Sequence, residues 1–172
     1  IFYFKVFLNI FRNIFFNHHE KQMRLLCLLL VFLGPSEGLP IRGRLLADNE
    51  VVLSFDDGPN DVTSPKLLDT LARHDIQALF FHVRVNIRNT TLMHRFMKEG
   101  HCLGVHTMTH AHLTRLSPRD AHAEIDRSID TFRNVTGEFP FFFRAPYGEQ
   151  SSELVSYVEK DHMFSFMWDF DT

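Results

Sequence analysis

The sequence predicts an α/β fold in which helices pack outside a parallel β-sheet, and three observations support this. From residue 51 onward, short apolar runs alternate with longer stretches of helical periodicity. The 172 residues, 45% hydrophobic and 23% charged, suit one globular domain with a buried core. Neither internal repeats nor a low-complexity linker interrupt the alternation. Strict strand–helix alternation favours a parallel sheet, whose chemistry gathers at the carboxyl ends of its strands.

Five strands are expected, because five short runs are rich in β-branched and aromatic residues: 51–55, 76–83, 102–105, 141–143 and 163–168. Four helices are expected between them, each with apolar residues at helical spacing: 63–72, 91–99, 118–136 and 151–160. Thr63-Ser64-Pro65 offers a cap and a first-turn proline to the first helix. The third has the clearest boundaries, since Ser117 can cap it, Pro118 suits its first turn and Gly137 can end it.

The N-terminal region is expected to carry a targeting segment. Residues 23–38 begin with Met-Arg, continue with an apolar run and end in small residues, as a secretory signal peptide does. The run is shorter than the stretch of about 20 apolar residues that spans a bilayer, so no stable membrane span is expected. Residues 1–22 hold no methionine and are interpreted as translation upstream of the start, which leaves 39–172 as the domain. With sequons at Asn89 and Asn134, this predicts a secreted protein, extracellular or in the cell wall.

Two adjacent carboxylates, Asp56 and Asp57, come directly after the first expected strand and precede Gly58-Pro59. Neighbouring carboxylates repel unless a cation neutralises one of them. A turn at Gly58-Pro59 could bring both around one site. The alternative is a simple Asp-Asp-Gly-Pro turn, and for this segment taken alone that interpretation is the stronger one.

His106 and His110 follow the third expected strand at a spacing of four residues. This spacing would place both on one face of a helical turn, so that both could face one ion. Neutral imidazole suits zinc and similar divalent ions. The alternative is a pair of surface histidines, because the chain has 11 histidines and two others, His101 and His112, lie close by.

The ends of the fourth and fifth strands carry weaker signals. Arg144 could hold a buried carboxylate in its ionised form. The turn around Tyr147 could present a backbone N–H to an oxyanion, although for this segment alone a structural strand-to-helix turn is preferred. Trp168 could form a wall on which a sugar stacks, whereas a lone tryptophan is more often part of a core.

Together these residues predict a metal site. Asp57, His106 and His110 would supply one carboxylate and two imidazoles, with open positions for a water and a substrate oxygen. Asp56 is then left as a candidate base for that water. The net charge of −3 gives no reason to expect a nucleic acid as a partner.

Three motifs in this order resemble those of the NodB-homology polysaccharide deacetylases, which include chitin deacetylases: Ser-Phe-Asp-Asp-Gly-Pro at 54–59, His-Thr-x-x-His at 106–110 and Arg-x-Pro-Tyr-Gly at 144–148. The resemblance extends over residues 50–172. It implies a distorted (β/α) barrel, incomplete here because the last strands are missing. It also implies a divalent metal ion, zinc or alternatively cobalt or nickel, held by Asp57, His106 and His110.

The resemblance further implies roles in the hydrolysis of an acetamide. Asp56 would take a proton from water, Arg144 would orient Asp56, and the Tyr147 N–H would stabilise the oxyanion. Tyr147 and Trp168 are expected to contact the substrate, which would be chitin or a related N-acetylglucosamine polymer. The products would be acetate and a free amino sugar.

The sequence also departs from the family pattern. A later Leu-x-His motif, whose histidine serves the family as general acid, is absent, and Asp171-Thr172 resembles the start of a longer Asp-Ser/Thr-x-Asp-Trp motif. We therefore expect a C-terminally truncated domain, with poor stability and weak or no catalysis in 39–172. One alternative is a non-catalytic polysaccharide-binding cell-wall protein of the same fold. Another is the same chemistry on peptidoglycan amides or on acetyl esters of xylan.

Overall fold

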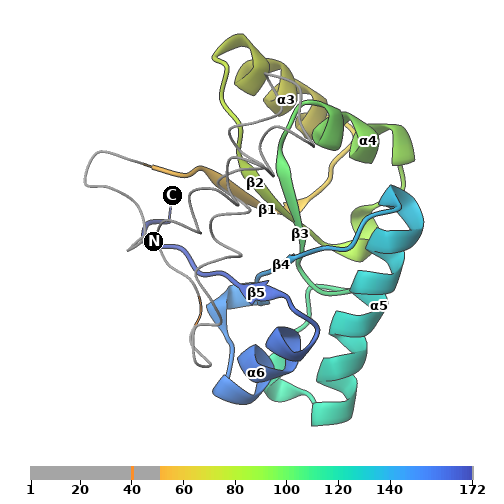
Figure 1. Ribbon diagram of the computed structural model, residues 1–172, viewed down its shortest axis with the longest axis vertical. Helices are drawn as coiled ribbons and strands as arrows, with labels where there is room; N and C mark the ends of the chain where they lie inside the picture. The colour runs from red at the N-terminus through yellow and green to blue at the C-terminus, as the bar shows by residue number, and fades with distance from the viewer. Residues whose placement is uncertain (1–39, 41–50, 172) are drawn as a thin grey trace, which may run out of the picture.

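A five-stranded parallel sheet forms the centre of the computed structural model, which describes residue 40 and residues 51–171 (Figure 1). The strands lie in chain order and each pairs in parallel with the next: β1 (Ser54–Gly58), β2 (Leu79–His82), β3 (Cys102–Val105), β4 (Phe142–Phe143) and β5 (Phe164–Ser165). This confirms the predicted parallel α/β sheet. The predictions for 1–22 and 23–38 lie outside the described residues.

Helices connect successive strands and line one side of the sheet (Figure 1). They are α3 (Thr63–Arg73), α4 (Thr90–Lys98), α5 (Pro118–Thr136) and α6 (Ser152–Lys160), close to the four predicted ranges. Short 3-10 turns lie at Arg84–Asn86 (η2), Leu113–Arg115 (η3) and Pro146–Gly148 (η4). Within residues 51–171, none of the helices combines the length and the apolar character needed to cross a membrane.

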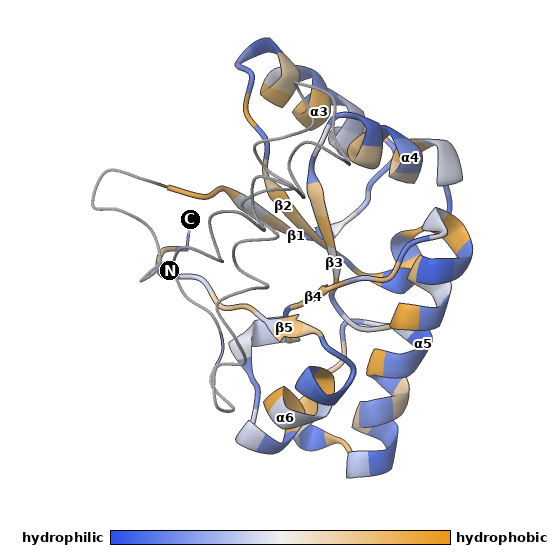
Figure 2. Cartoon of the chain, in the orientation of Figure 1, coloured by the Kyte–Doolittle hydropathy of each residue, from blue (hydrophilic) through white to orange (hydrophobic). Residues whose placement is uncertain are grey.

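The core is divided between the two faces of the sheet. Side chains of alternate strand residues point to opposite faces, so Phe80 joins the larger cluster under the helices, with Phe96 and Ile125, whereas Phe81 joins a smaller cluster with Phe166 on the other face. Figure 2 shows apolar strands at the centre and hydrophilic residues on the outer sides of the helices.

The capping residues agree with the sequence prediction in α5 and differ from it in α3. Ser117 caps α5 by accepting a hydrogen bond from the Asp120 N–H at 3.2 Å, and Gly137 ends it with φ of 73°. At α3, by contrast, the capping side chain is Asn60, whose Oδ1 accepts hydrogen bonds from the Val62 and Thr63 N–H groups at 2.9 and 3.0 Å. The prediction that Thr63-Ser64-Pro65 supplies the cap is therefore wrong.

Strand β1 begins three residues later than its predicted range 51–55 and includes both aspartates. It pairs Ser54 with Leu79 and Phe55 with Phe80, and then the register shifts before Gly58 pairs with His82. The first pair of the ladder is Ser54 with Leu79, and just before it the Leu53 carbonyl accepts a hydrogen bond from the Leu79 N–H at 2.9 Å. The aspartates consequently lie within an irregular strand end.

Candidate metal centre

The irregularity in β1 places the two aspartates around one site. Asp57 has φ of 65°, a left-handed conformation that costs a non-glycine residue energy and interrupts the strand. The Asn86 side chain donates a hydrogen bond to the Asp57 carbonyl at 2.8 Å and holds this segment. The sequence suggested that a turn at Gly58-Pro59 brings both carboxylates around one site. In the structure a bulge at Asp57, within the strand, has this effect.

The two histidines come from an irregular loop after β3. Thr107 and His110 both have positive φ, 68° and 64°, so this segment is not the helical turn inferred from their spacing. The Thr107 hydroxyl accepts a hydrogen bond from the His110 N–H at 3.0 Å and closes the loop. The expectation that both rings face one point is met, but by loop closure.

Asp57, His106 and His110 converge at the carboxyl ends of β1 and β3. One ligand atom from each lies within 4.8 Å of the others. Asp57 Oδ1 is 3.5 Å from His106 Nε2 and 3.0 Å from His110 Nε2. Two neutral imidazoles and one carboxylate are a donor set that suits zinc and similar divalent ions. The side chains therefore fit a metal ion of this class.

The surroundings of His106 favour the form that binds metal. Its Nδ1 lies 2.6 Å from the Arg144 carbonyl oxygen, which can only accept, so the proton is on Nδ1 and the Nε2 lone pair faces Asp57. Burial lowers the pKa of His106, and this outweighs the opposing effects of Asp56 and of the Arg144 carbonyl. The ring is therefore held neutral with Nε2 free to coordinate.

Arg144 holds Asp56 beside these ligands. Its Nη1 donates to Asp56 Oδ1 at 2.8 Å and to the Ser54 hydroxyl at 2.9 Å, and its guanidinium lies 4.1 Å from the centre of the Phe81 ring. Burial lowers the pKa of Arg144, whereas the Asp56 carboxylate raises it. The other Asp56 oxygen, Oδ2, is 3.9 Å from His106 Nε2 and faces the ligand cluster.

Tyr147 contacts His110 at Nδ1, the ring nitrogen that is not the one near Asp57. Its hydroxyl is 3.1 Å from His110 Nδ1, and its backbone in η4 is left-handed, with φ of 61°. Among the described residues, no group accepts a hydrogen bond from the Tyr147 N–H. Trp168 lies against the next residue of this turn, since a Cβ added to Gly148 would be 2.9 Å from the indole.

Several residues at this site were not identified from the sequence. Ser54 and Asn86 contact Arg144 and the Asp57 backbone, respectively. His112 stacks flat on the Tyr147 ring at 3.7 Å, and Glu149 lies 3.0 Å from His112 Nδ1. The sequence signal for His112 was present in its position two residues after His110, but it was interpreted only as part of a general abundance of histidines.

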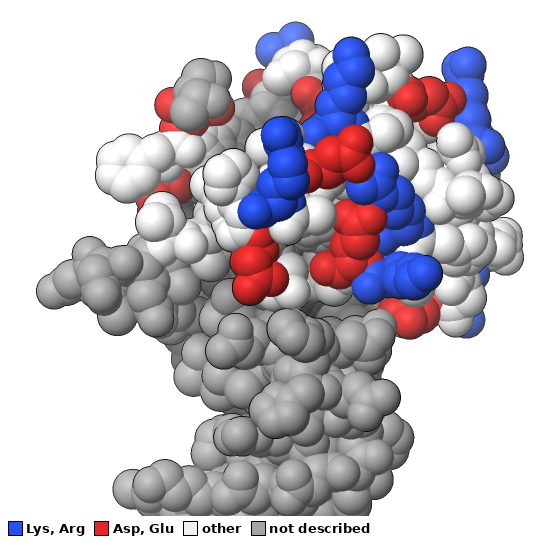
Figure 3. Space-filling model, turned by 90° about the horizontal axis from the view of Figure 1, so that it is seen from above, with Lys and Arg blue, Asp and Glu red and all other residues white. Residues whose placement is uncertain are grey.

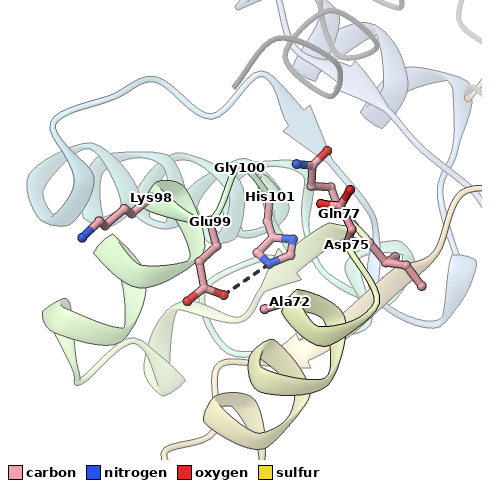
Figure 4. A pocket seen from close by; sticks show the side chains of 8 residues that line it. Ala72, Asp75, Gln77, Lys98, Glu99, Gly100 and His101 are labelled. Atoms are coloured by element: carbon pink, nitrogen blue, oxygen red, sulfur yellow. Dashed lines mark ion pairs between the residues drawn. The ribbon is translucent and has the colours of Figure 1, made fainter. Parts of the chain in front are cut away.

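A separate pocket opens at the other end of the strands, before β2 and β3, and is lined by Ala72, Asp75, Ile76, Gln77, Lys98, Glu99, Gly100 and His101. Figure 4 shows the His101 ring directed toward Glu99, with Nε2 3.9 Å from the carboxylate. On the face shown in Figure 3, basic and acidic side chains are interspersed. The pocket does not belong to the metal centre, because Asp57, His106 and His110 are not among its lining residues.

The fold and the site define a parallel α/β domain with a two-histidine, one-aspartate ligand set at the carboxyl ends of its strands. A family model described as "Polysaccharide deacetylase" matches residues 45–164. The chain therefore belongs to the polysaccharide deacetylase family. This agrees with the fold and the family that the three motifs predicted, and the parallel sheet is consistent with part of a NodB-type (β/α) barrel.

Relatives and solved structures support this assignment. The chain is 32% identical over 124 residues to a peptidoglycan-N-acetylglucosamine deacetylase of Bacillus cereus, covering 72% of this chain and 45% of the relative. It is 33% identical over 131 residues to a chitooligosaccharide deacetylase of Bradyrhizobium sp., covering 75% and 60%. The structure is similar to that of the chitin deacetylase from Colletotrichum lindemuthianum, with a TM-score of 0.67, 28% identity and coverage of 76% and 59%. The chain thus spans about half the length of these relatives.

Proposed function

We propose that the chain is a metal-dependent hydrolase that removes N-acetyl groups from chitin-type polymers of N-acetylglucosamine. One observation carries the proposal: Asp57, His106 and His110 present ligand atoms within 4.8 Å of one another, beside an aspartate that is not part of the cluster. The names of the relatives support the substrate class, because they include acetylated glucosamine and chitooligosaccharide. Zinc is the proposed metal, because two imidazoles and one carboxylate are ligands that zinc prefers.

The reaction is the hydrolysis of an amide. Water oxygen adds to the acetyl carbon, the C–N bond breaks, and the proton lost by water is balanced by one gained at the sugar nitrogen, giving acetate and an amine. When bound, a divalent cation supplies Lewis acidity, which acidifies water and polarises the carbonyl.

Asp56 is the proposed base. Its Oδ1 accepts from Arg144 at 2.8 Å, whereas Oδ2 faces the ligand cluster and is available to take the proton from water. Arg144 is held in turn by Ser54 and by the Phe81 ring, so the carboxylate has one orientation. The Tyr147 N–H, which has no acceptor among the described residues, is proposed to donate to the developing oxyanion.

The exposed Tyr147 ring and the neighbouring Trp168 are the proposed contacts for sugar rings. Tyr147 is 51% exposed, and Trp168 lies against the same turn at Gly148. His112 covers one face of the Tyr147 ring, so the exposed remainder of this ring and the Trp168 indole are the proposed sugar contacts. The proposed partner is therefore the polysaccharide itself. Secretion through a signal peptide at 23–38 is proposed from the sequence, and N-terminal sequencing of protein exported by a eukaryotic host tests it.

The test is acetate release by the zinc-loaded chain from chitin oligomers, with peptidoglycan fragments and acetylated xylan as parallel substrates. We expect release from chitin oligomers, weak as the sequence predicts, that chelation abolishes and added zinc restores. Asp56→Asn should lower kcat by at least about 100-fold with zinc affinity retained, because only the base is lost. His106→Ala should lose zinc affinity as well.

Two results would contradict the proposal. Chelator-insensitive release would exclude the metal centre, and preference for peptidoglycan or xylan would replace the substrate. If the chain binds chitin equally well with and without chelator but releases no acetate, the non-catalytic binding alternative is correct.

A further inference from the structure

Tyr147 has an unusual combination of strain and exposure. Its φ of 61° places a bulky residue in the left-handed region, a strained conformation that persists only where neighbouring groups hold it. Burial does not hold it, because Tyr147 is 51% exposed. The restraint therefore comes from the backbone hydrogen bonds of the turn, Gly148 N–H to Ala145 O at 3.2 Å and Glu149 N–H to Pro146 O at 3.1 Å, together with specific side-chain contacts.

The contacts come from the loop that carries the metal ligands. The His112 ring stacks on the Tyr147 ring with centroids 3.7 Å apart and an interplanar angle of 5°. Tyr147 also contacts His110: the two ring centroids lie 4.6 Å apart at an interplanar angle of 66°, and the Tyr147 hydroxyl lies 3.1 Å from His110 Nδ1. Tyr147 thus contacts two histidines of the same loop.

Glu149 fixes the outer histidine. Its Oε2 accepts hydrogen bonds from His112 Nδ1 and from the Thr114 hydroxyl, each at 3.0 Å, while Arg115 lies 3.9 Å from Oε1. His110 thus contacts Tyr147 while His112 contacts Glu149, so the loops that follow β3 and β4 are joined at two successive points. His112 is about one-third exposed, so these bonds, more than burial, determine the orientation of its ring.

We propose that His112 and Glu149 are positioning residues for the deacetylation. They clamp Tyr147 so that its hydroxyl orients the His110 ring and its N–H remains directed at the reacting carbonyl; the second part rests on the proposed function. The first part concerns metal binding alone. For His110 Nε2 to coordinate as a neutral ring, Nδ1 must carry the proton and donate it to the Tyr147 oxygen, a partner that fixes both ring and tautomer.

The chain provides a matched control. His122 on α5 stacks on Tyr157 of α6 with centroids 3.6 Å apart and an interplanar angle of 2°. This pair has the same chemistry as His112–Tyr147 but contacts none of the ligand residues in the described structure. If removing any histidine that stacks on a tyrosine lowers cobalt affinity or kcat, His122→Ala will therefore show the same loss.

The experiment compares the full chain with His112→Ala, Glu149→Ala, Glu149→Gln, the double alanine variant and His122→Ala. Cobalt(II) titration, followed by visible absorption, reports affinity and ligand geometry without any turnover. We expect cobalt affinity to fall roughly 10-fold in His112→Ala and Glu149→Ala, with an altered spectrum. On chitin oligomers we expect kcat to fall roughly 10- to 100-fold with KM little changed. Glu149→Gln, which keeps an acceptor for His112, should retain most of both.

The double alanine variant should lose no more than either single variant, because the two residues act as one unit. Unchanged cobalt affinity and spectrum in His112→Ala, or equal losses in His122→Ala, would overturn the positioning role. If the parent chain releases no acetate, the proposed function fails, while the cobalt arm still decides whether the clamp holds His110.

Discussion

Among single residues, His82 shows how a buried polar group can lack a structural partner. Its side chain is 1% exposed, lies against Phe80 and Phe96, and neither ring nitrogen has a hydrogen-bond partner among the described residues. Burial, with a smaller effect of His106, lowers its pKa to about 3, so the ring is neutral. Desolvated nitrogens without partners reduce stability.

We predict that His82→Leu raises the free energy of unfolding by roughly 1 kcal/mol, because an apolar side chain of similar size removes the unpaired nitrogens and leaves no orphaned partner. Urea unfolding with chelator present measures this. His94→Leu, at an exposed position on α4, is the control and should give no such gain. A loss of stability in His82→Leu would show that the ring supports the neighbouring Gly58 segment through a contact the leucine cannot replace.

Among the elements, the pairing of β3 with β4 depends on Gly104. A Cβ at this position would lie 2.6 Å from the Phe142 carbonyl oxygen and 2.8 Å from the Phe81 ring, too close on both sides. Gly104 faces Phe142 in the register, and β3 leads directly into His106. The close approach of these strands therefore positions one metal ligand.

We predict that Gly104→Ala lowers the free energy of unfolding by about 1–3 kcal/mol or more through overpacking against backbone. It should also weaken cobalt binding, because displacement of β3 moves His106. Gly137→Ala is the matched control: φ there is +73° and a Cβ would meet nothing within 4 Å, so only backbone strain of about 1 kcal/mol is expected. Equal effects of the two substitutions on cobalt binding would refute the role of strand spacing.

For the whole molecule, stability should depend on pH through buried histidines such as His101. Its ring is 2% exposed, and Nδ1 accepts a hydrogen bond from the Ala78 N–H at 3.2 Å, which requires an unprotonated nitrogen. Burial is the main cause that lowers its pKa below 6.5; Glu99 opposes this effect and Arg95 adds to it. The folded state thus favours the neutral ring.

The sign of the pH dependence follows. Above pH 6.5 the ring is neutral in both states, so its contribution to stability is complete. As the pH falls below this value, the unfolded chain takes up a proton and the folded chain does not, which lowers stability by up to about 1.4 kcal/mol per pH unit for one histidine. We predict that the free energy of unfolding of His101→Gln, measured in urea with chelator, falls less steeply between pH 7.5 and 5.5 than that of the parent. The difference in slope should be at most about 1.4 kcal/mol per pH unit. Slopes parallel to those of the parent and of His94→Gln would contradict this.

The alternation of apolar runs and helical stripes determined the α/β class and the span of α5, because these depend on local periodicity and capping. Three short motifs were enough to select Asp56, Asp57, His106, His110, Arg144 and Tyr147, because parallel strands bring their carboxyl ends to one edge wherever the chain runs between them. The ligand set could therefore be predicted from residue types and their places after strands.

Only the tertiary structure decided how these residues meet. The bulge at Asp57 and the non-helical loop from His106 to His110 depend on contacts with Asn86 and within the loop, which no local pattern encodes. The clamp of His112 and Glu149 on Tyr147 joins residues from different loops. A sequence specifies periodicity and chemical type locally, whereas left-handed backbone and side-chain pairing depend on which distant segments the packed sheet brings into contact.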